Sequence, residues 1–287
     1  MWIPWNWALL IAAGLATVGV LAHRMENRWW VRSGSFARES ALVFVLYAVW
    51  NFVGRLSVMR VDGALGRAEL LWDVEAWLPI PTVVQVQDVV LRFPWLVQAS
   101  NAYYAIAHVP GMVAVMVWLF WRHREHYAWV RNSLALMTAA GVAVHLIPIA
   151  PPRFLPHHGV IDTPLLYGQS VYTTFGSTVA GQLSALPSLH VGWAVLVALA
   201  TMRATRSPGR WLGPLHAVTT VLVVVATGNH FWLDGLAAIL ILAFALHVER
   251  QVVGPIAAAT GARLALGPRA RPTDRQPTGA DTARQKV

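Results

Sequence analysis

Long apolar segments separated by short polar connections dominate the sequence. Each segment is near the roughly 20 residues that a helix needs to cross a bilayer, and the seven segments cover residues 3–22, 39–59, 95–121, 131–149, 188–203, 211–229 and 231–249. No positively charged region precedes the first segment, so we interpret it as an uncleaved span rather than as a signal peptide. The pattern predicts an all-α protein, a polytopic membrane bundle of about six to seven transmembrane helices.

The composition agrees with a membrane protein and excludes several kinds of chemistry. Hydrophobic residues make up 56% of the 287 residues and charged residues 12%, about half the charged share of a soluble domain. The absence of cysteine excludes disulfides, thiolate nucleophiles and cysteine-based metal centres. The only lysine is Lys286, which excludes lysine Schiff-base chemistry and P-loop phosphate binding.

The distribution of positive charge predicts the orientation in the membrane, because cytoplasmic loops are rich in arginine and lysine. Most of the 22 cationic side chains fall in the connections after the first, third and fifth segments and in the tail: Arg24, Arg28, Arg32, Arg38, Arg122, Arg124, Arg131, Arg203, Arg206, Arg210, Arg250, Arg263, Arg269, Arg271, Arg275, Arg284 and Lys286. These connections alternate along the chain. The sequence therefore predicts a multi-pass plasma-membrane protein with its N-terminus outside and its C-terminus in the cytoplasm.

The same pattern divides the chain into four parts. We expect N-terminal spans over residues 1–60, an extracytoplasmic interfacial segment over 61–94, a transmembrane core over 95–249 and a basic, disordered cytoplasmic tail over 250–287. Within the second part, Ala68–Leu78 mixes acidic residues with leucine and tryptophan, which predicts a helix lying in the membrane surface. The basic tail directly follows the last span, a position that favours membrane lipids as partners and not nucleic acid. Nothing in the sequence indicates an oligomeric state.

Asp234 is the only acidic residue well inside an apolar segment. Ionisable groups within membrane spans are costly and mark candidate functional sites. His230 precedes Asp234 by four residues, a spacing that places both side chains on one face of a helix. Asp234 would then orient the imidazole and leave its other nitrogen basic and nucleophilic. The alternative is a buried polar pair with a structural role alone.

Two more segments carry polar groups suited to binding an anion. Pro187-Ser188-Leu189-His190 opens the fifth apolar segment, where the unpaired N–H groups of a helix start favour negative charge. Arg153 follows the fourth segment in a proline-rich run, either as a phosphate ligand or as an ordinary arginine at the membrane surface. Because successive spans alternate in direction, the topology places five candidate residues on the extracytoplasmic face: Arg153, Ser188, His190, His230 and Asp234. One active site on that face explains their placement.

These motifs resemble those of the type 2 phosphatidic acid phosphatase superfamily. Pro187-Ser188-Leu189-His190 is similar to the second motif of that family, normally Pro-Ser-Gly-His, and His230-x-x-x-Asp234 is similar to the end of the third. Leucine in place of glycine, together with a Pro-Pro-Arg-Phe first motif, most resembles the inositol-phosphorylceramide-synthase-like branch. The resemblance covers roughly residues 95–249.

The resemblance implies a role for each motif residue in phosphoryl transfer from a lipid phosphate or a phospholipid headgroup. His230 would form a phosphohistidine and Asp234 would orient it. His190 would protonate the leaving oxygen and then activate the acceptor. Ser188, the amides around Leu189 and Arg153 would hold the phosphate oxygens. The resemblance implies no metal and no other cofactor.

The sequence departs from the family pattern at two cationic positions. The first motif usually has a lysine seven residues before its arginine, and that position is Leu146 here, next to His145. The third motif usually has an arginine six residues before its histidine, and that position is Val224. Arg153 therefore remains as the main phosphate-binding cation, with His145, Thr227 and Asn229 as further candidates for binding the substrate.

Several alternatives remain at this point. Water as the acceptor would make the protein a phosphatase, and an alcohol would make it a transferase of a phosphate-bearing headgroup. Loss of the two cations also fits a non-catalytic, lipid-binding relative of the family. A third interpretation is a zinc site built from His190, His230 and Asp234. Polar residues of the third segment would line a headgroup pocket or hold helices together: Asn101, Tyr103, Tyr104 and His108.

Overall fold

The structure is a helical bundle, as the apolar pattern predicts. The computed structural model describes residues 3–25, 27–57, 62–170, 182–257 and 259. The first residues of the predicted disordered tail, 250–257, are helical and continue α12, and most of the rest lies outside the described residues. Every regular element within these residues is helical, apart from a single bridge between Ile149 and Ser184. The prediction of an all-α polytopic bundle is confirmed.

Within the described residues, eleven α-helices and several shorter helical turns follow one another along the chain. The α-helices are α1 (Trp5–His23), α2 (Arg28–Ser57), α3 (Ala64–Ala76), α4 (Val83–Leu91), α5 (Pro94–Ile106), α6 (His108–Arg122), α7 (Arg124–Val144), α8 (Thr163–Leu166), α10 (Leu189–Ala204), α11 (Leu212–Ala226) and α12 (Trp232–Val248). The 3₁₀ turns are η2 (Pro152–Phe154), η3 (Pro156–His158) and η5 (Pro208–Trp211), and a π-helical turn, η6 (Glu249–Val253), continues α12.

Each predicted apolar segment coincides with a helix or a helix pair, but fewer of these helices are long and apolar enough to span a membrane than the seven segments suggest. Among the described residues three qualify by length and composition: α1, the segment Pro208–Ala226 and the segment Trp232–Ala257. The pair α5 and α6 makes a fourth if it counts as one span. That α2, α7 and α10 also cross the membrane stays a prediction.

The third predicted segment, residues 95–121, is not one straight helix. It forms α5 and α6, whose axes differ by 49° across the break at Ala107. Pro110 explains the position of this break, because proline has no N–H for the carbonyl of Ile106 and its ring crowds that carbonyl. The bend brings His108, the first residue of α6, into the interior of the bundle.

The core lies around α10, which packs against α6, α7, α11 and α12. Leu196 and Val197 of α10 join Met137 of α7 and Leu242 of α12 in one buried apolar cluster. Gly192 allows the close approach of α7, because a Cβ at this position would collide with the side chain of Met137. The two helices therefore pack closely at this position.

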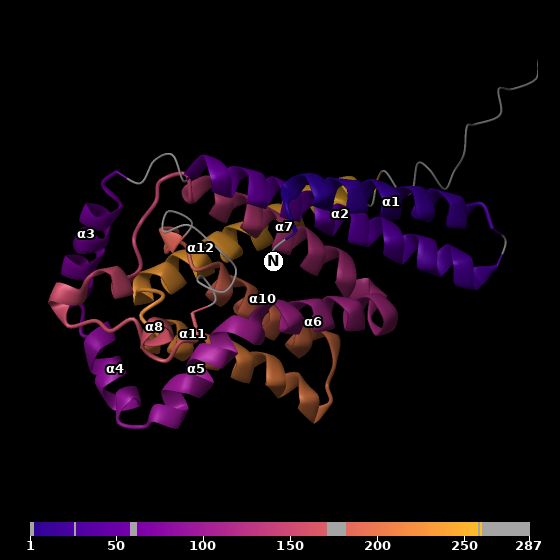
Figure 1. Ribbon diagram of the computed structural model, residues 1–287. Helices are drawn as coiled ribbons and strands as arrows, with labels where there is room; N and C mark the ends of the chain where they lie inside the picture. The colour runs from indigo at the N-terminus through magenta and orange to yellow at the C-terminus, as the bar shows by residue number, and fades with distance from the viewer. Residues whose placement is uncertain (1–2, 26, 58–61, 171–181, 258, 260–287) are drawn as a thin grey trace, which may run out of the picture.

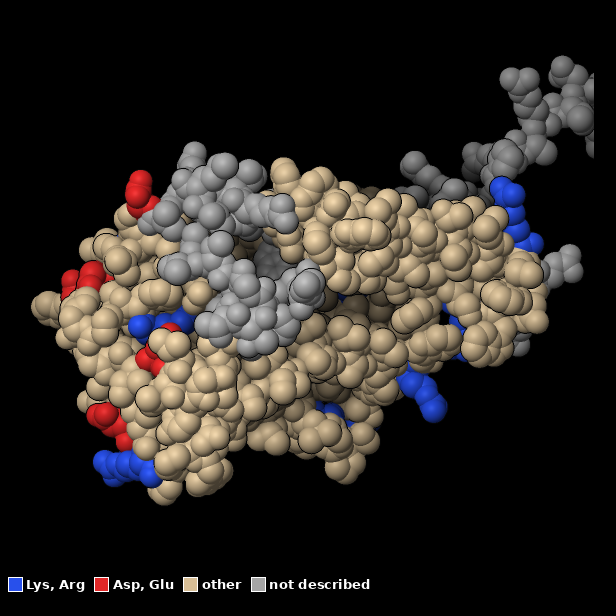
Figure 2. Space-filling model, in the orientation of Figure 1, with Lys and Arg blue, Asp and Glu red and all other residues tan. Residues whose placement is uncertain are grey.

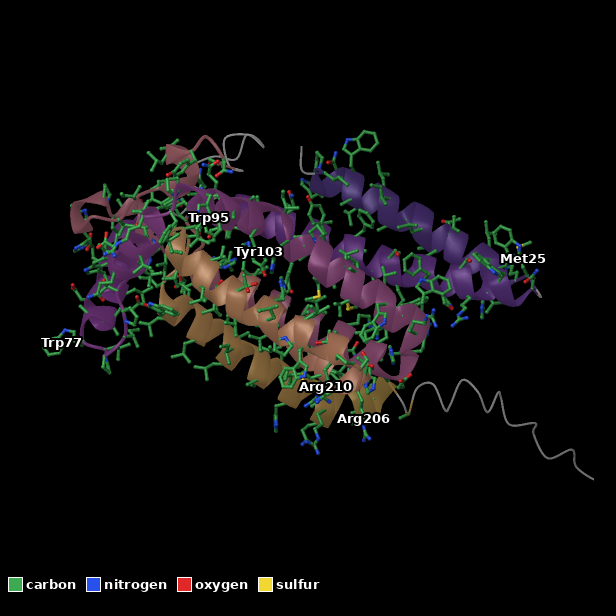
Figure 3. The ribbon with its side chains drawn as sticks, turned by 90° about the horizontal axis from the view of Figure 1, so that it is seen from below. Met25, Trp77, Trp95, Tyr103, Arg206 and Arg210 are labelled. Carbon is green, nitrogen blue, oxygen red and sulfur yellow. The ribbon has the colours of Figure 1, made fainter. Side chains whose placement is uncertain are left out.

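The two ends of the bundle differ in shape and charge. Figure 1 shows α1 and α2 as an antiparallel pair that extends away from the end formed by α3 and α4. On the face drawn in Figure 2, acidic side chains gather at the end formed by α3, α4 and α8, and the surface over α1 and α2 is largely uncharged. In Figure 3, Trp77 lies at the α3 end, whereas Arg206 and Arg210 lie at the opposite end.

Candidate active site

The start of α10 supplies the first part of the site. Ser188 is the N-cap residue, and its hydroxyl accepts a hydrogen bond from the N–H of Val191 at 3.4 Å. The N–H of Ser188 donates to the carbonyl of Asp234 at 3.0 Å, which ties the start of α10 to the start of α12. A serine at this position satisfies one N–H of the helix start, and its own hydroxyl proton remains available to a phosphate oxygen.

His230 and Asp234 form the second part, at the start of α12. The Nδ1 atom of His230 lies 3.2 Å from Oδ2 of Asp234, and the same carboxylate oxygen accepts the N–H of Phe231 at 2.9 Å. The carbonyl of Ala185 lies closer to Nδ1, at 2.9 Å. Two acceptors therefore hold a proton on Nδ1, which leaves Nε2 with its lone pair. Sequence reasoning missed Ala185, because a backbone acceptor carries no side-chain signal.

Arg153 is held against the loop that precedes His230. Its N–H donates to the carbonyl of Gly228 at 2.9 Å, and its guanidinium donates to the side chain of Asn229. Gly228 has a φ of 68°, and a Cβ there would lie 3.3 Å from the Cβ of Arg153, so glycine suits both the conformation and the close contact. Pro152 at the start of η2 presets the turn that carries Arg153.

Two residues that the sequence analysis did not single out complete the surroundings of Arg153. Gln182 accepts a hydrogen bond from its guanidinium at 3.1 Å, and a carboxylate oxygen of Asp162 lies 3.6 Å from its Nε. Arg153 is only 6% exposed. The polar neighbours therefore hold the planar, two-pronged guanidinium of Arg153, its fork of N–H donors, in one orientation. A phosphate would bind by sharing or replacing their hydrogen bonds.

Thr227 and Asn229 lie in the site but act on Arg153. The amide of Asn229 donates to the hydroxyl of Thr227 at 2.8 Å, and that hydroxyl donates to the carbonyl of Val223 at 2.7 Å. Asn229 thus has its oxygen on Arg153 and its nitrogen on Thr227. The geometry makes both residues supports for the guanidinium, while direct contact with substrate stays a prediction.

His190 is enclosed by aromatic rings. Tyr104 stacks on it with ring centroids 4.5 Å apart, and His108 lies at 4.3 Å. The ring of His190 is 5.6 Å from that of His230, so the two histidines of the separate motifs face one reaction space. Of the four polar residues in the third segment, Asn101 bonds to Thr163 and Tyr103 to His216. Those two therefore link helices and loops, away from His190.

The structure also shows what surrounds the two positions at which the family usually has a cation. His145 is the C-cap residue of α7, and its Nε2 lies 3.3 Å from the carbonyl of Pro187, so it reaches the second motif. Leu146 is 40% exposed and offers no charge. Val224 is buried, and its carbonyl accepts the N–H groups of both Asn229 and His230 at 3.0 Å. Backbone bonding at this position therefore shapes the loop before His230 without a cation.

Helix α3 contacts the chain segments that carry the site residues. Glu75 accepts a hydrogen bond from the N–H of Leu233, in the first turn of α12, at 2.8 Å. The carbonyl of Ala64 accepts the N–H of Ala150 at 3.1 Å, shortly before Arg153. The predicted helix over Ala68–Leu78 is therefore present as far as Ala76, as part of α3, and it contacts both chain segments that carry the candidate residues.

Glu75 predicts a pH-dependent stability. Burial raises the pKa of its carboxyl from the ordinary 4.5 to about 7. The folded state therefore binds this proton more tightly than the unfolded state, so its stabilising effect is complete below about pH 4.5 and is lost as the pH rises through about 7. We expect the melting temperature of the wild type to fall, relative to that of Glu75→Gln, between about pH 5 and about pH 8. Asp73→Asn, an exposed acid on the same helix, is the control, and parallel pH profiles of wild type and Glu75→Gln would contradict the prediction.

The described residues do not support the zinc interpretation of the catalytic motifs. The only three His, Asp or Glu side chains there whose ligand atoms meet closely enough to hold a metal ion are Glu69, His157 and His158. His190, His230 and Asp234 do not form such a group. Their arrangement suits a nucleophile, its orienting carboxylate and a proton donor, beside a buried arginine and a helix N-terminus.

A site of this kind in an apolar helical bundle is typical of a membrane protein that acts on phosphate groups. Comparison with protein families agrees: a model of the PAP2 superfamily matches residues 69–248, and the chain belongs to that superfamily. No curated protein and no solved structure matches the chain significantly. Membership indicates an enzyme of the phosphatase or phosphotransferase type and confirms the resemblance at the level of the superfamily.

Proposed function

We propose that the protein is a membrane enzyme that transfers a phosphoryl or phosphate-bearing group from a lipid by way of a phosphohistidine on His230. One observation carries the proposal: Asp234 and the carbonyl of Ala185 both engage Nδ1 of His230. The other nitrogen, Nε2, is thereby left as the nucleophile. It shares a reaction space with the imidazole of His190.

The proposed reaction has two steps. In the first, Nε2 of His230 attacks phosphorus and the bond to the lipid oxygen breaks, while His190 gives that oxygen a proton. In the second, His190 takes a proton from the acceptor, whose oxygen displaces the histidine from phosphorus. Arg153 and the N–H groups at the start of α10 stabilise the negative charge on the phosphate oxygens in both steps.

The identity of the acceptor separates two forms of the proposal. Water gives a lipid phosphatase, and an alcohol gives a transferase like those of the inositol-phosphorylceramide-synthase-like branch, which Leu189 and the Pro-Pro-Arg-Phe segment favour. The direct test is phosphate release from a panel of lipid phosphates and diphosphates, with the purified chain in detergent and EDTA. The same assay with inositol or diacylglycerol added detects transfer. A folded protein that supports neither reaction would favour a non-catalytic lipid-binding role.

We also propose that the site faces the extracytoplasmic side. The site lies at the α3 end of the bundle, because Glu75 of α3 contacts the first turn of α12. Arg206 and Arg210 lie at the opposite end (Figure 3), which the enrichment of cations in cytoplasmic loops assigns to the cytoplasm.

This orientation predicts the outcome of reporter fusions. Green fluorescent protein at the C-terminus should fluoresce, because it folds in the cytoplasm, and alkaline phosphatase at the same position should be inactive. Fusions truncated after residue 170, on the α3 side, should give the opposite pattern. An active C-terminal alkaline phosphatase would contradict the proposed orientation.

A further inference from the structure

A cluster of one carboxylate and two imidazoles lies outside the catalytic site. Glu69 projects from α3 toward η3, the turn that carries His157 and His158. One carboxylate oxygen lies 2.8 Å from Nε2 of His157, and the other lies 2.7 Å from Nε2 of His158. Two segments far apart in the sequence therefore present three potential ligands to one point.

The donor set is that of a divalent transition-metal ion. Imidazole nitrogen and carboxylate oxygen together suit zinc and its neighbours, whereas magnesium and calcium prefer oxygen alone. The three ligand atoms lie within 4.8 Å of one another, a separation that atoms around an ion with bonds of ~2.0–2.2 Å satisfy. Two histidines and one carboxylate also leave room for water or another ligand in the fourth position.

The surroundings hold the ligands in place. Trp72, three residues after Glu69 on the same face of α3, stacks on the ring of His158 with centroids 4.2 Å apart and planes 15° from parallel. Pro156 begins η3, and Gly159 ends it with a φ of 85°. The side chain of His157 is 60% exposed, so an ion can enter from solvent without opening the fold.

We propose that Glu69, His157 and His158 form a binding site for a divalent transition-metal ion of the zinc class, which joins α3 to the loop that carries Arg153. In the metal-bound form the ion replaces the two Nε2 protons, and each neutral imidazole keeps its proton on Nδ1. Arg153 lies in η2, directly before η3. The ion therefore strengthens the attachment of the Arg153 loop to α3, which already includes the hydrogen bond between Arg67 and the carbonyl of Pro148. The reacting groups of the proposed phosphoryl transfer take no part in it.

Zinc titration of the purified full-length chain tests the site without any need for turnover. After chelator treatment and its removal, isothermal titration with zinc chloride should show one tight site per chain. His157→Asn removes the most exposed ligand and Glu69→Gln removes the carboxylate. Each variant should weaken binding by at least ~100-fold, because even loss of an outer partner of a ligand costs ~10–100-fold. His126→Asn is the matched control, since it alters another histidine that lies near a glutamate.

The proposal also predicts that zinc stabilises the attachment. Saturating zinc should raise the melting temperature of the wild type and of His126→Asn, but not that of His157→Asn. Wild-type binding weaker than about 100 µM, or unchanged affinity in both ligand variants, would overturn the site. Tight binding that is lost equally in the control would place the ion elsewhere and would overturn it as well. Because the readouts are binding and stability, an absence of phosphatase activity would leave this result intact.

Discussion

Replacing His230 by alanine should abolish phosphoryl transfer and leave the protein folded. The reason is that Ala185 and Asp234 engage Nδ1 of His230, so that Nε2 is the nucleophile of the proposed mechanism, and alanine removes this atom. We expect a loss of at least ~10⁴-fold in turnover, in line with other enzymes that lose a covalent nucleophile. The measurement is phosphate release or headgroup transfer with the best lipid of the panel, together with trapping of an acid-labile phosphoenzyme.

Two comparisons make this result specific. His216→Ala, in α11 and bonded to Tyr103, changes a histidine outside the proposed machinery. It should keep most activity, although loss of its bond to Tyr103 lowers the melting temperature somewhat. Asp234→Asn should lose less activity than His230→Ala, because the carbonyl of Ala185 still holds Nδ1. Substantial turnover or a trapped phosphoenzyme in His230→Ala would contradict the proposed mechanism.

Arg153 should be the second most sensitive position. The cations usual at the positions of Leu146 and Val224 are absent, so in the proposed mechanism one buried guanidinium carries most of the charge stabilisation. Arg153→Ala should lower kcat/KM by ~10²–10³-fold, the usual effect of removing one donor to a developing negative charge. Arg153→Lys should restore little, because a point charge cannot reproduce the planar fork that Asn229 and Gln182 hold.

Stability must be measured beside activity for these variants. Loss of the guanidinium leaves the oxygens of Asn229 and Gln182 without their donor, so a lower melting temperature is expected as well. Asp162→Asn is the matched control: it removes the ion pair with Arg153 but keeps the guanidinium, and it should retain most activity. Wild-type kcat/KM in Arg153→Lys would show that charge alone suffices and would contradict the role of the fork.

The positions of the helices and the grouping of the motifs could be predicted from the sequence, because both follow from local or one-dimensional rules. Apolar runs of near-membrane length form helices. His230 does lie next to Asp234, at 3.2 Å, but the two do not share a helix face as predicted, because α12 begins at Trp232 and Phe231 is its N-cap residue. The alternation of spans predicted that Arg153, His190 and His230 belong together. The structure brings Arg153 to the loop before His230, and it brings His190 to the ring of His230.

Contacts between distant segments could be decided only by the tertiary structure. The carbonyl of Ala185 on His230, Gln182 and Asp162 on Arg153, and Glu75 at the start of α12 depend on how the loops pack. No periodicity or motif encodes such contacts. The sequence did not predict the break at Ala107, because the third apolar segment continues across Pro110 and hydrophobicity alone therefore predicts one span.

The sequence by itself therefore determined an apolar helical protein, its motif residues and the one side on which they were expected to meet. These properties depend on hydrophobic length, charge distribution and short spacings, each readable along the chain. The tertiary structure decided which neighbours orient those residues. It bonded Asn229 to the guanidinium of Arg153, and Thr227 to Asn229. It also brought Glu69 to His157 and His158. The physical reason is that hydrogen bonds and ligand geometry act over a few ångströms, and only packing brings remote segments that close.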